Sequence, residues 1–208
     1  MSTASETSPA PAAGARWAWP ALGLILLAAF GALVVLWWTG RPPAEDDPAV
    51  AFARDMMAHH RQAVEMAILI RDRSQDAELR QMLLDVILTQ QAQIGQMQGW
   101  LTVWGLPLNG ARPPMSDHSS HGADMPPNMG MASDADVESL RTLSLAEAEI
   151  KFLRLMILHH QGGVYMSQAI LEKTDRPEVV LLAESIILSQ EKEISYMQGL
   201  LQDRGQTP

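Results

Sequence analysis

The chain has 208 residues, a formal net charge of −9 and no Cys. The acidic balance argues against nucleic acid as a partner, because phosphate binding requires a basic surface. The absence of Cys excludes disulfides, thiolate zinc sites and thiol catalysis. Met is abundant instead, with 13 residues against 3 Phe and 2 Tyr. Met serves either as adaptable core filler or as a thioether ligand for a soft metal.

Residues 1–16 are rich in Ser, Thr, Ala and Pro, a composition that predicts a disordered N-terminal tail. Residues 17–38 are apolar and uncharged with Trp at both ends, which is the pattern of a transmembrane helix. The alternative is a cleaved signal peptide, whose apolar region is shorter, roughly 7–15 residues. We therefore expect a single-pass membrane anchor, an acidic linker at residues 39–46, and a C-terminal part outside the cytoplasm, periplasmic or at the cell surface.

The chain contains an internal repeat with an offset of one hundred positions. Residues 52–66 read FARDMMAHHRQAVEM, and residues 152–166 read FLRLMILHHQGGVYM. A duplicated unit of this length indicates a repeated supersecondary structure. The identical residues include His, Met and Gln as well as aliphatic side chains: Phe52/Phe152, Met56/Met156, His59/His159, His60/His160, Val64/Val164, Met66/Met166, Gln90/Gln190 and Met97/Met197.

Each repeat predicts a helical hairpin. Asp47-Pro48 indicates the start of a helix that extends to about Arg73. A second helix extends from about Asp76 to Trp104, and Gly105 and Pro107 end it. In the second repeat, Ser144 and Glu147 form a predicted capping box. Two amphipathic hairpins bury their apolar stripes against each other, so we expect an all-α four-helix bundle. Its expected parts are the whole bundle 47–205, repeats 47–105 and 144–205, a Met/His-rich loop 106–132, and a short helix 133–141.

His59 belongs to the apolar seam of the first helix, with Met56 and Met66 on the same face. A hairpin folded about residues 74–75 would place His59 beside Gln90, and the second repeat would place His159 beside Gln190. One interpretation is a buried hydrogen bond that sets the helix register. The other is a metal site, favoured by the doubled His-His pair, the flanking Met residues and the Met/His-rich loop.

The ligands in the sequence narrow the choice of metal. No Glu-x-x-His occurs, so the di-iron carboxylate site of helix bundles lacks its ligands. Imidazole suits several metals, whereas thioether selects Cu(I) and its congener Ag(I). We therefore expect copper, with Cu(I) favoured and silver as the alternative. The predicted ligands are Met56, His59, His60, Met66, Met156, His159, His160 and Met166; the loop adds Met115, His118, His121, Met125, Met129 and Met131; Gln90, Gln190, Met97 and Met197 form the expected surrounding shell.

The repeated M-x-x-HH-x-x-x-x-x-M, the SDADVESLR segment at residues 133–141 and the downstream I-x-x-M-Q-G resemble domain-of-unknown-function family 305, the CopM-like proteins. The resemblance covers about residues 47–203. It implies a ferritin-like four-helix bundle, secreted or membrane-anchored. For CopM-like members it implies copper binding through Met and His in copper tolerance.

The leading hypothesis is a membrane-anchored protein, not an enzyme, that sequesters or transfers Cu(I) outside the cytoplasm. A protein partner in copper handling is compatible with the Met-rich segments. One alternative is an interaction module whose buried His pair is structural or senses pH. Another is a small metal-dependent oxidoreductase, for which the sequence offers no acid–base pair or nucleophile.

Overall fold

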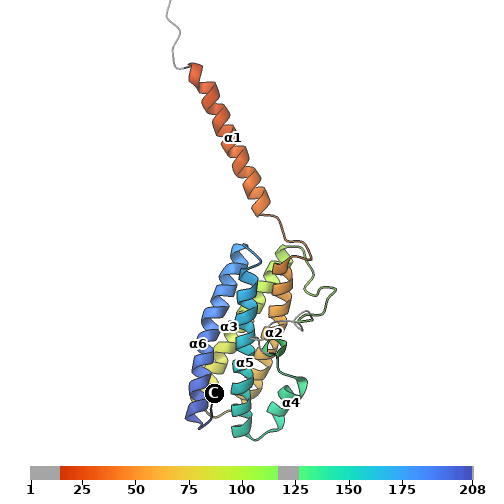
Figure 1. Cartoon of the computed structure of the whole chain (residues 1–208), viewed down its shortest axis with the longest axis vertical. Coiled ribbons are helices and arrows are strands. Elements are labelled where there is room, and N and C mark those ends of the chain that lie inside the picture. The colour runs from red at the N-terminus through yellow and green to blue at the C-terminus, as the bar shows by residue number, and fades with distance from the viewer. Residues whose placement is uncertain (1–14, 117–126, 208) are drawn as a thin grey trace, which may run out of the picture. The chain divides into compact units, whose positions relative to one another are not determined.

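The computed structural model describes residues 15–116 and 127–207, and it divides into two compact units, Met1–Pro42 and Pro43–Pro208. Every regular element in these described residues is helical, which confirms the all-α prediction (Figure 1). The elements are α1 (Ala15–Thr39), α2 (Pro48–Arg73), α3 (Ala77–Val103), the 3₁₀ turn η2 (Pro127–Gly130), α4 (Asp134–Thr142), α5 (Leu145–Leu171) and α6 (Pro177–Asp203).

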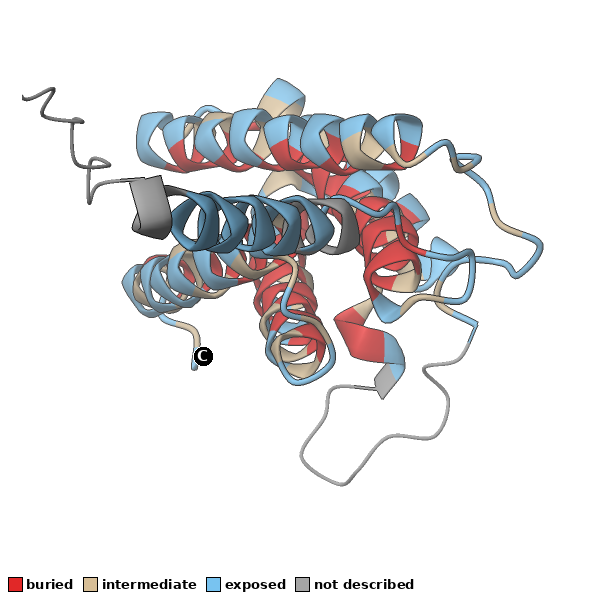
Figure 2. Cartoon of the chain, turned by 90° about the horizontal axis from the view of Figure 1, so that it is seen from above, coloured by how far each residue is buried: buried red, intermediate tan, exposed pale blue. Residues whose placement is uncertain are grey.

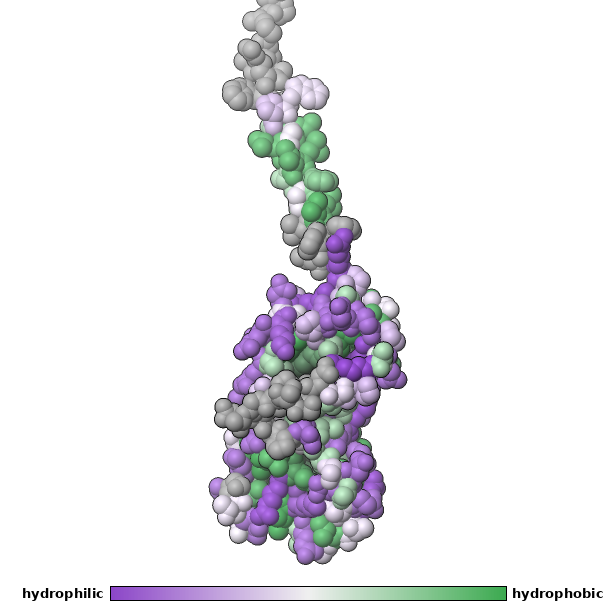
Figure 3. Space-filling model, turned by 45° about the vertical axis from the view of Figure 1, so that its right-hand side comes forward, coloured by the Kyte–Doolittle hydropathy of each residue, from purple (hydrophilic) through white to green (hydrophobic). Residues whose placement is uncertain are grey.

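Helix α1 contains the apolar stretch that was predicted to cross a membrane. Its described side chains, including Leu24, Ile25 and Phe30, are exposed within this unit, and hydrophobic residues cover its surface (Figure 3). Among the described residues, however, no helix has the length and apolar character that a membrane span requires. The predicted transmembrane helix at residues 17–38 is therefore not confirmed.

Local sequence signals explain where the long helices begin and end. Asp47 caps α2 by accepting a hydrogen bond from the Ala49 N–H at 2.8 Å, with Pro48 in the first helical position. Gly105 ends α3 in the left-handed region, with φ of 71°, and the Leu106 N–H bonds back to the Leu101 carbonyl. The second repeat has the same arrangement at its C-terminal end, where Gly205 follows α6 with φ of 69°.

The capping box predicted at the start of α5 is absent. The Ser144 hydroxyl donates to the Glu147 carboxylate at 2.5 Å and does not cap a backbone N–H. The hydroxyl and the carboxylate therefore bond to each other, and α5 begins without a side-chain cap on its backbone N–H groups.

The bundle consists of the hairpins α2–α3 and α5–α6, which meet mainly through α2 and α5. The buried faces of these helices turn toward one another (Figure 2). Two apolar clusters fill the interior, one around Phe152 and Leu83, the other around Phe52 and Ile186. Each fully buried aliphatic or Met side chain contributes roughly 1.5–3 kcal/mol to folding.

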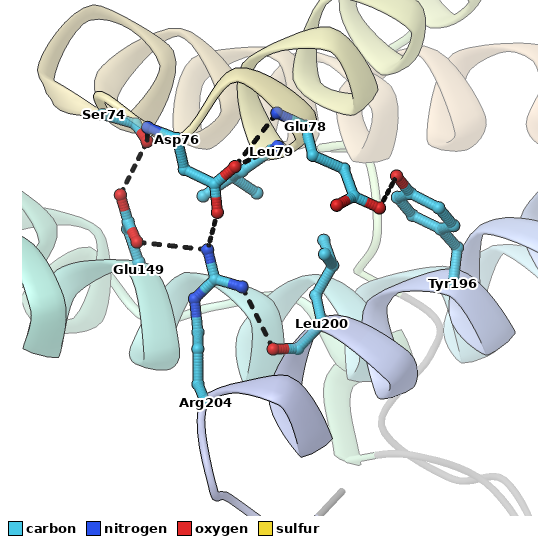
Figure 4. A network of polar contacts seen from close by, with 8 residues as sticks. All are labelled: Ser74, Asp76, Glu78, Leu79, Glu149, Tyr196, Leu200 and Arg204. Carbon is cyan, nitrogen blue, oxygen red and sulfur yellow. Dashed lines mark hydrogen bonds and ion pairs between the residues drawn. The ribbon is translucent and has the colours of Figure 1, made fainter.

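The two hairpins also contact each other at the ends of the outer helices (Figure 4). Arg204, at the C-terminal end of α6, bonds to Asp76, the N-cap of α3, and lies 3.3 Å from the Glu149 carboxylate. Glu149 also accepts from the Ser74 hydroxyl at 2.6 Å. The equivalent positions at the other end are Trp104 and Arg176, whose guanidinium lies 5.6 Å from the Trp104 ring centroid. Both repeats thus have a contact between these equivalent positions, which is an ion pair at one end of the bundle and a cation–π contact at the other.

Candidate functional site

A polar layer separates the two apolar clusters. It consists of His59, His60, Gln90, Gln93, His159, His160, Gln190 and Glu193. All four histidines have no exposed surface, and the three glutamines are at most 6% exposed. Burying this many polar groups opposes folding unless each finds a partner, so the layer has the character of a functional site.

The layer joins histidines from the two repeats. The rings of His59 in α2 and His159 in α5 stack with centroids 3.6 Å apart and planes inclined by 29°. The second histidine of each pair lies further away, with a ring centroid separation of 6.3 Å both for His59–His60 and for His159–His160. The single stretch that the sequence repeats therefore supplies both halves of one buried group.

Three of the four imidazoles have an oxygen atom beside Nε2. His59 Nε2 lies 3.0 Å from the Met129 carbonyl oxygen, His60 Nε2 lies 2.7 Å from Gln93 Oε1, and His160 Nε2 lies 2.6 Å from Glu193 Oε2. Because these oxygens only accept, each Nε2 carries the proton and donates it. In a neutral imidazole the lone pair then lies on Nδ1, which in His60 and His160 has no hydrogen-bond partner in the described chain.

The hydrogen-bond partners of the histidines differ from those that the sequence predicted. The predicted His59–Gln90 and His159–Gln190 hydrogen bonds do not form, and both glutamine side chains are buried with no hydrogen bond among the described residues. The facing helices instead supply Gln93 and Glu193, about one helical turn beyond Gln90 and Gln190, and these bond to His60 and His160, not to His59 and His159. Both positions are polar and one hundred residues apart, a signal that the sequence offered.

Burial keeps two of these histidines neutral. Burial is the largest influence on His159, and the neighbouring His59, His160 and His60 add to it, so its pKa lies well below the ordinary value. Burial also lowers the pKa of His60 to about 4, against the opposing effect of its hydrogen bond to Gln93. Neutral imidazole is the form that binds metal ions.

The predicted methionine ligands, and the methionines of the expected surrounding shell, Met97 and Met197, lie on either side of the polar layer. One apolar cluster contains Met66, Met156 and Met197, and the other contains Met56, Met97 and Met166. All six are at most 4% exposed. Met57, which the repeat does not mark as a ligand, is 1% exposed in the second cluster.

The segment 127–132 packs into the groove between α2 and α5. A Cβ on Gly162 would lie 1.7 Å from the Met129 carbonyl oxygen, so only Gly permits this approach. On the α2 side, the Gln62 side chain donates to the Ala132 carbonyl at 2.9 Å and accepts from its N–H at 2.8 Å. This close packing brings the Met129 carbonyl oxygen within hydrogen-bonding distance of His59 Nε2.

Three of the six loop ligands that the sequence predicted lie in the described residues. Met129 is buried, whereas Met115 and Met131 are half-buried. Met115 packs against the apolar cluster around Phe52, and its N–H donates to Asp55 at 2.7 Å. His118, His121 and Met125 lie outside the described residues.

A pocket of about 430 Å³ opens on the bundle surface, and Phe52, Asp55, Met129 and Met166 belong to its lining. Two of the predicted sulfur ligands thus border a hollow on the bundle surface. Within the described ranges, no three His, Asp or Glu side chains are grouped so as to hold a metal ion. An ion bound in this layer would therefore depend on thioether sulfur as well as imidazole.

Residues 49–201 match the family described as Domain of unknown function (DUF305). The chain belongs to the DUF305 family. The match includes most of both repeats, the segment between them and the whole polar layer.

Solved structures that are similar to this chain have the same fold. A protein of Streptomyces coelicolor, described as a secreted DUF305 protein, is 43% identical with a TM-score of 0.71, over 79% of this chain and 98% of that one. A DUF305 fragment of Deinococcus radiodurans is 41% identical with a TM-score of 0.65, over 76% and 97%. CopM in its Cu(I)-bound form is 28% identical with a TM-score of 0.59, over 74% and 96%.

A curated relative matches over a shorter range. Uncharacterized protein L153 of Acanthamoeba polyphaga mimivirus is 35% identical over 68 residues, which are 33% of this chain and 44% of that protein. The match thus spans less than half the length of that relative.

Proposed function

We propose that this DUF305 protein binds a soft cation, Cu(I) with Ag(I) as its congener, in the polar layer of the bundle, and that it sequesters or transfers the ion without catalysing a reaction. The observation that carries the proposal is the stack of His59 on His159, which joins the two repeats inside a fully buried layer. The similar bundle of CopM has been solved with Cu(I) and with Cu(II) bound.

The chemistry of the layer favours a soft ion. His60 and His159 are neutral near pH 7, because burial lowers the pKa of each. Methionines belong to the apolar clusters on both sides of the layer, and thioether sulfur selects Cu(I) over harder divalent ions. The described residues offer no cluster of carboxylates and histidines of the kind that zinc or di-iron sites use.

The proposed ligands are the His and Met residues that the repeat supplies twice. They are Met56, His59, His60 and Met66 from α2, and Met156, His159, His160 and Met166 from α5. The loop residues Met115, His118, His121, Met125, Met129 and Met131 are candidates for a second, more accessible site.

A competition titration of the full-length chain with a chromophoric Cu(I) chelator tests the proposal. We expect His59→Ala/His159→Ala to lose binding, while the matched loop variant His118→Ala/His121→Ala/Met125→Ala retains it. Thermal melting of each metal-free variant, followed by circular dichroism, verifies that it is folded. If only the loop variant loses binding, the polar layer is not the site, and if the wild-type chain binds no Cu(I), the proposed function is wrong.

A second candidate function is a purely structural or pH-sensing layer. The hydrogen bonds of His60 to Gln93 and of His160 to Glu193 favour it, because each satisfies a buried polar group without a metal. This candidate predicts that Cu(I) neither binds nor changes the melting temperature of the wild-type chain.

The similarity to a secreted DUF305 protein supports a location outside the cytoplasm. Attachment to a membrane through residues 17–38 stays a prediction. Fractionation of cells that express the chain, with and without residues 17–38, tests it: an anchor keeps the protein in the membrane fraction after a carbonate wash.

A further inference from the structure

The two repeats present the same histidine contact with a different acceptor. His60 donates to the Gln93 amide oxygen at 2.7 Å, and His160 donates to the Glu193 carboxylate at 2.6 Å. Gln93 and Glu193 occupy equivalent positions of the repeat. The two contacts therefore differ mainly in charge, which gives the chain an internal comparison.

The acceptor on one ring nitrogen controls what the other nitrogen can do. It fixes the orientation of the imidazole and raises the basicity of the opposite nitrogen, and a metal-binding His commonly donates to a carboxylate or carbonyl in this way. In both His60 and His160 that opposite atom is Nδ1, which is buried and has no hydrogen-bond partner in the described structure. The layer thus contains two oriented imidazoles of the same kind, one supported by an amide and one by a carboxylate.

Among the described residues, no Arg or Lys neutralises the charge of Glu193. Its carboxylate contacts the His160 ring, which carries a charge only when it is protonated. The Glu193 side chain is 21% exposed, so water screens it only in part. A carboxylate in this position attracts a cation near His160 more strongly than a neutral amide attracts one near His60.

We propose that Glu193 is a positioning residue that makes the second repeat the tighter half of the layer for a soft cation, while Gln93 leaves the first repeat the weaker half. The inference rests on the proposed function and adds an order of filling to it. The His160 half loads first and retains its ion, and the His60 half loads later and releases its ion more readily to an acceptor.

The test uses the full-length chain in four forms: wild type, Glu193→Gln, Gln93→Glu, and the exchange Gln93→Glu/Glu193→Gln. Gln keeps an acceptor for the His160 N–H, so we expect metal-free Glu193→Gln to melt within a few degrees of wild type. Its tightest Cu(I) affinity should fall about 10–100-fold, the usual effect of removing such a partner. Gln93→Glu should tighten the weaker step, and the exchange should restore the tight step.

The order of filling is measured by ¹⁵N NMR of the imidazole nitrogens. In wild type, we expect His160 Nδ1 to shift at lower Cu(I) than His60 Nδ1, and in the exchange variant the order should reverse. A purely structural role for Glu193 would not reverse it. The inference is overturned if the two histidines shift together in wild type, or if Glu193→Gln binds Cu(I) as tightly as wild type does. A wild-type chain that binds no Cu(I) overturns the proposed function itself, an outcome distinct from both.

Discussion

The imidazole rings of His59 and His159 lie face to face with centroids 3.6 Å apart, although one hundred residues separate them in the chain. Each ring comes from the central part of its helix, and both are fully buried. Neither ring nitrogen of His159 has a hydrogen-bond partner in the described residues. A buried group of this kind costs stability, so a purely structural explanation of His159 is unfavourable.

This relationship predicts opposite effects at two neighbouring histidines. His159→Leu should raise the free energy of unfolding of the metal-free protein by about 1–2 kcal/mol, because it removes unpaired polar atoms from the core. The same substitution should abolish tight Cu(I) binding.

The matched control is His60→Leu, which leaves the 6% exposed Gln93 side chain without its partner. It should lower the free energy of unfolding by about 1–3 kcal/mol. Urea denaturation measures both variants, and a loss of stability in His159→Leu would contradict the prediction.

The metal-free protein should lose stability as the pH falls from about 6.5 toward 4. Burial is the main reason that the pKa of His60 drops from 6.5 to about 4 in the folded chain. The unfolded chain binds the proton more tightly, so the contribution of His60 is fully present above pH 6.5 and is lost on acidification. It amounts to roughly 3 kcal/mol at most. Urea denaturation at several pH values should show a shallower dependence in His60→Asn, and equal slopes would disprove the assignment to His60.

Gly162→Ala should destabilise the bundle although Ala favours helix. The added Cβ would lie 1.7 Å from the Met129 carbonyl oxygen, so η2 or α5 has to move. We expect a loss of about 1–3 kcal/mol from overpacking, together with weaker contact between Met129 and His59. Gly99→Ala in α3 is the control, since nothing lies within 4 Å of its Cβ, and it should gain about 0.5–1 kcal/mol. Equal melting temperatures for the two variants would argue against close packing at Gly162.

Arg204→Ala should destabilise the bundle more than the equivalent loss of an exposed arginine. Arg204 bonds to Asp76 and to Glu149, which is 8% exposed, so its removal leaves a buried carboxylate without a cation. We expect a loss of about 1–3 kcal/mol. Arg154→Ala removes a 2.9 Å bond to Gln206 at the surface and should change stability by less than about 0.5 kcal/mol. Calorimetry of both variants compares them directly, and a similar effect of the two would show that the Asp76–Arg204–Glu149 contacts contribute little.

The sequence alone determined the features that local interactions control. The spacing of apolar residues and the repeat located the four long helices, Asp47 and Gly105 marked two of their ends, and the seam position of His59 implied its burial. These features depend on residues within a few positions of one another, where backbone hydrogen bonding and helical periodicity decide the outcome.

Only the tertiary structure decided the partners of the histidines. The register of each hairpin depends on how side chains from two helices interlock. A difference of one turn placed Gln93 and Glu193 against His60 and His160, and left Gln90 and Gln190 without a hydrogen bond to His59 and His159. The path of residues 127–132 brought the Met129 carbonyl to His59 through a close approach at Gly162. The stacking of His59 on His159 required both hairpins to pack together, and no periodicity within either repeat encodes that distance.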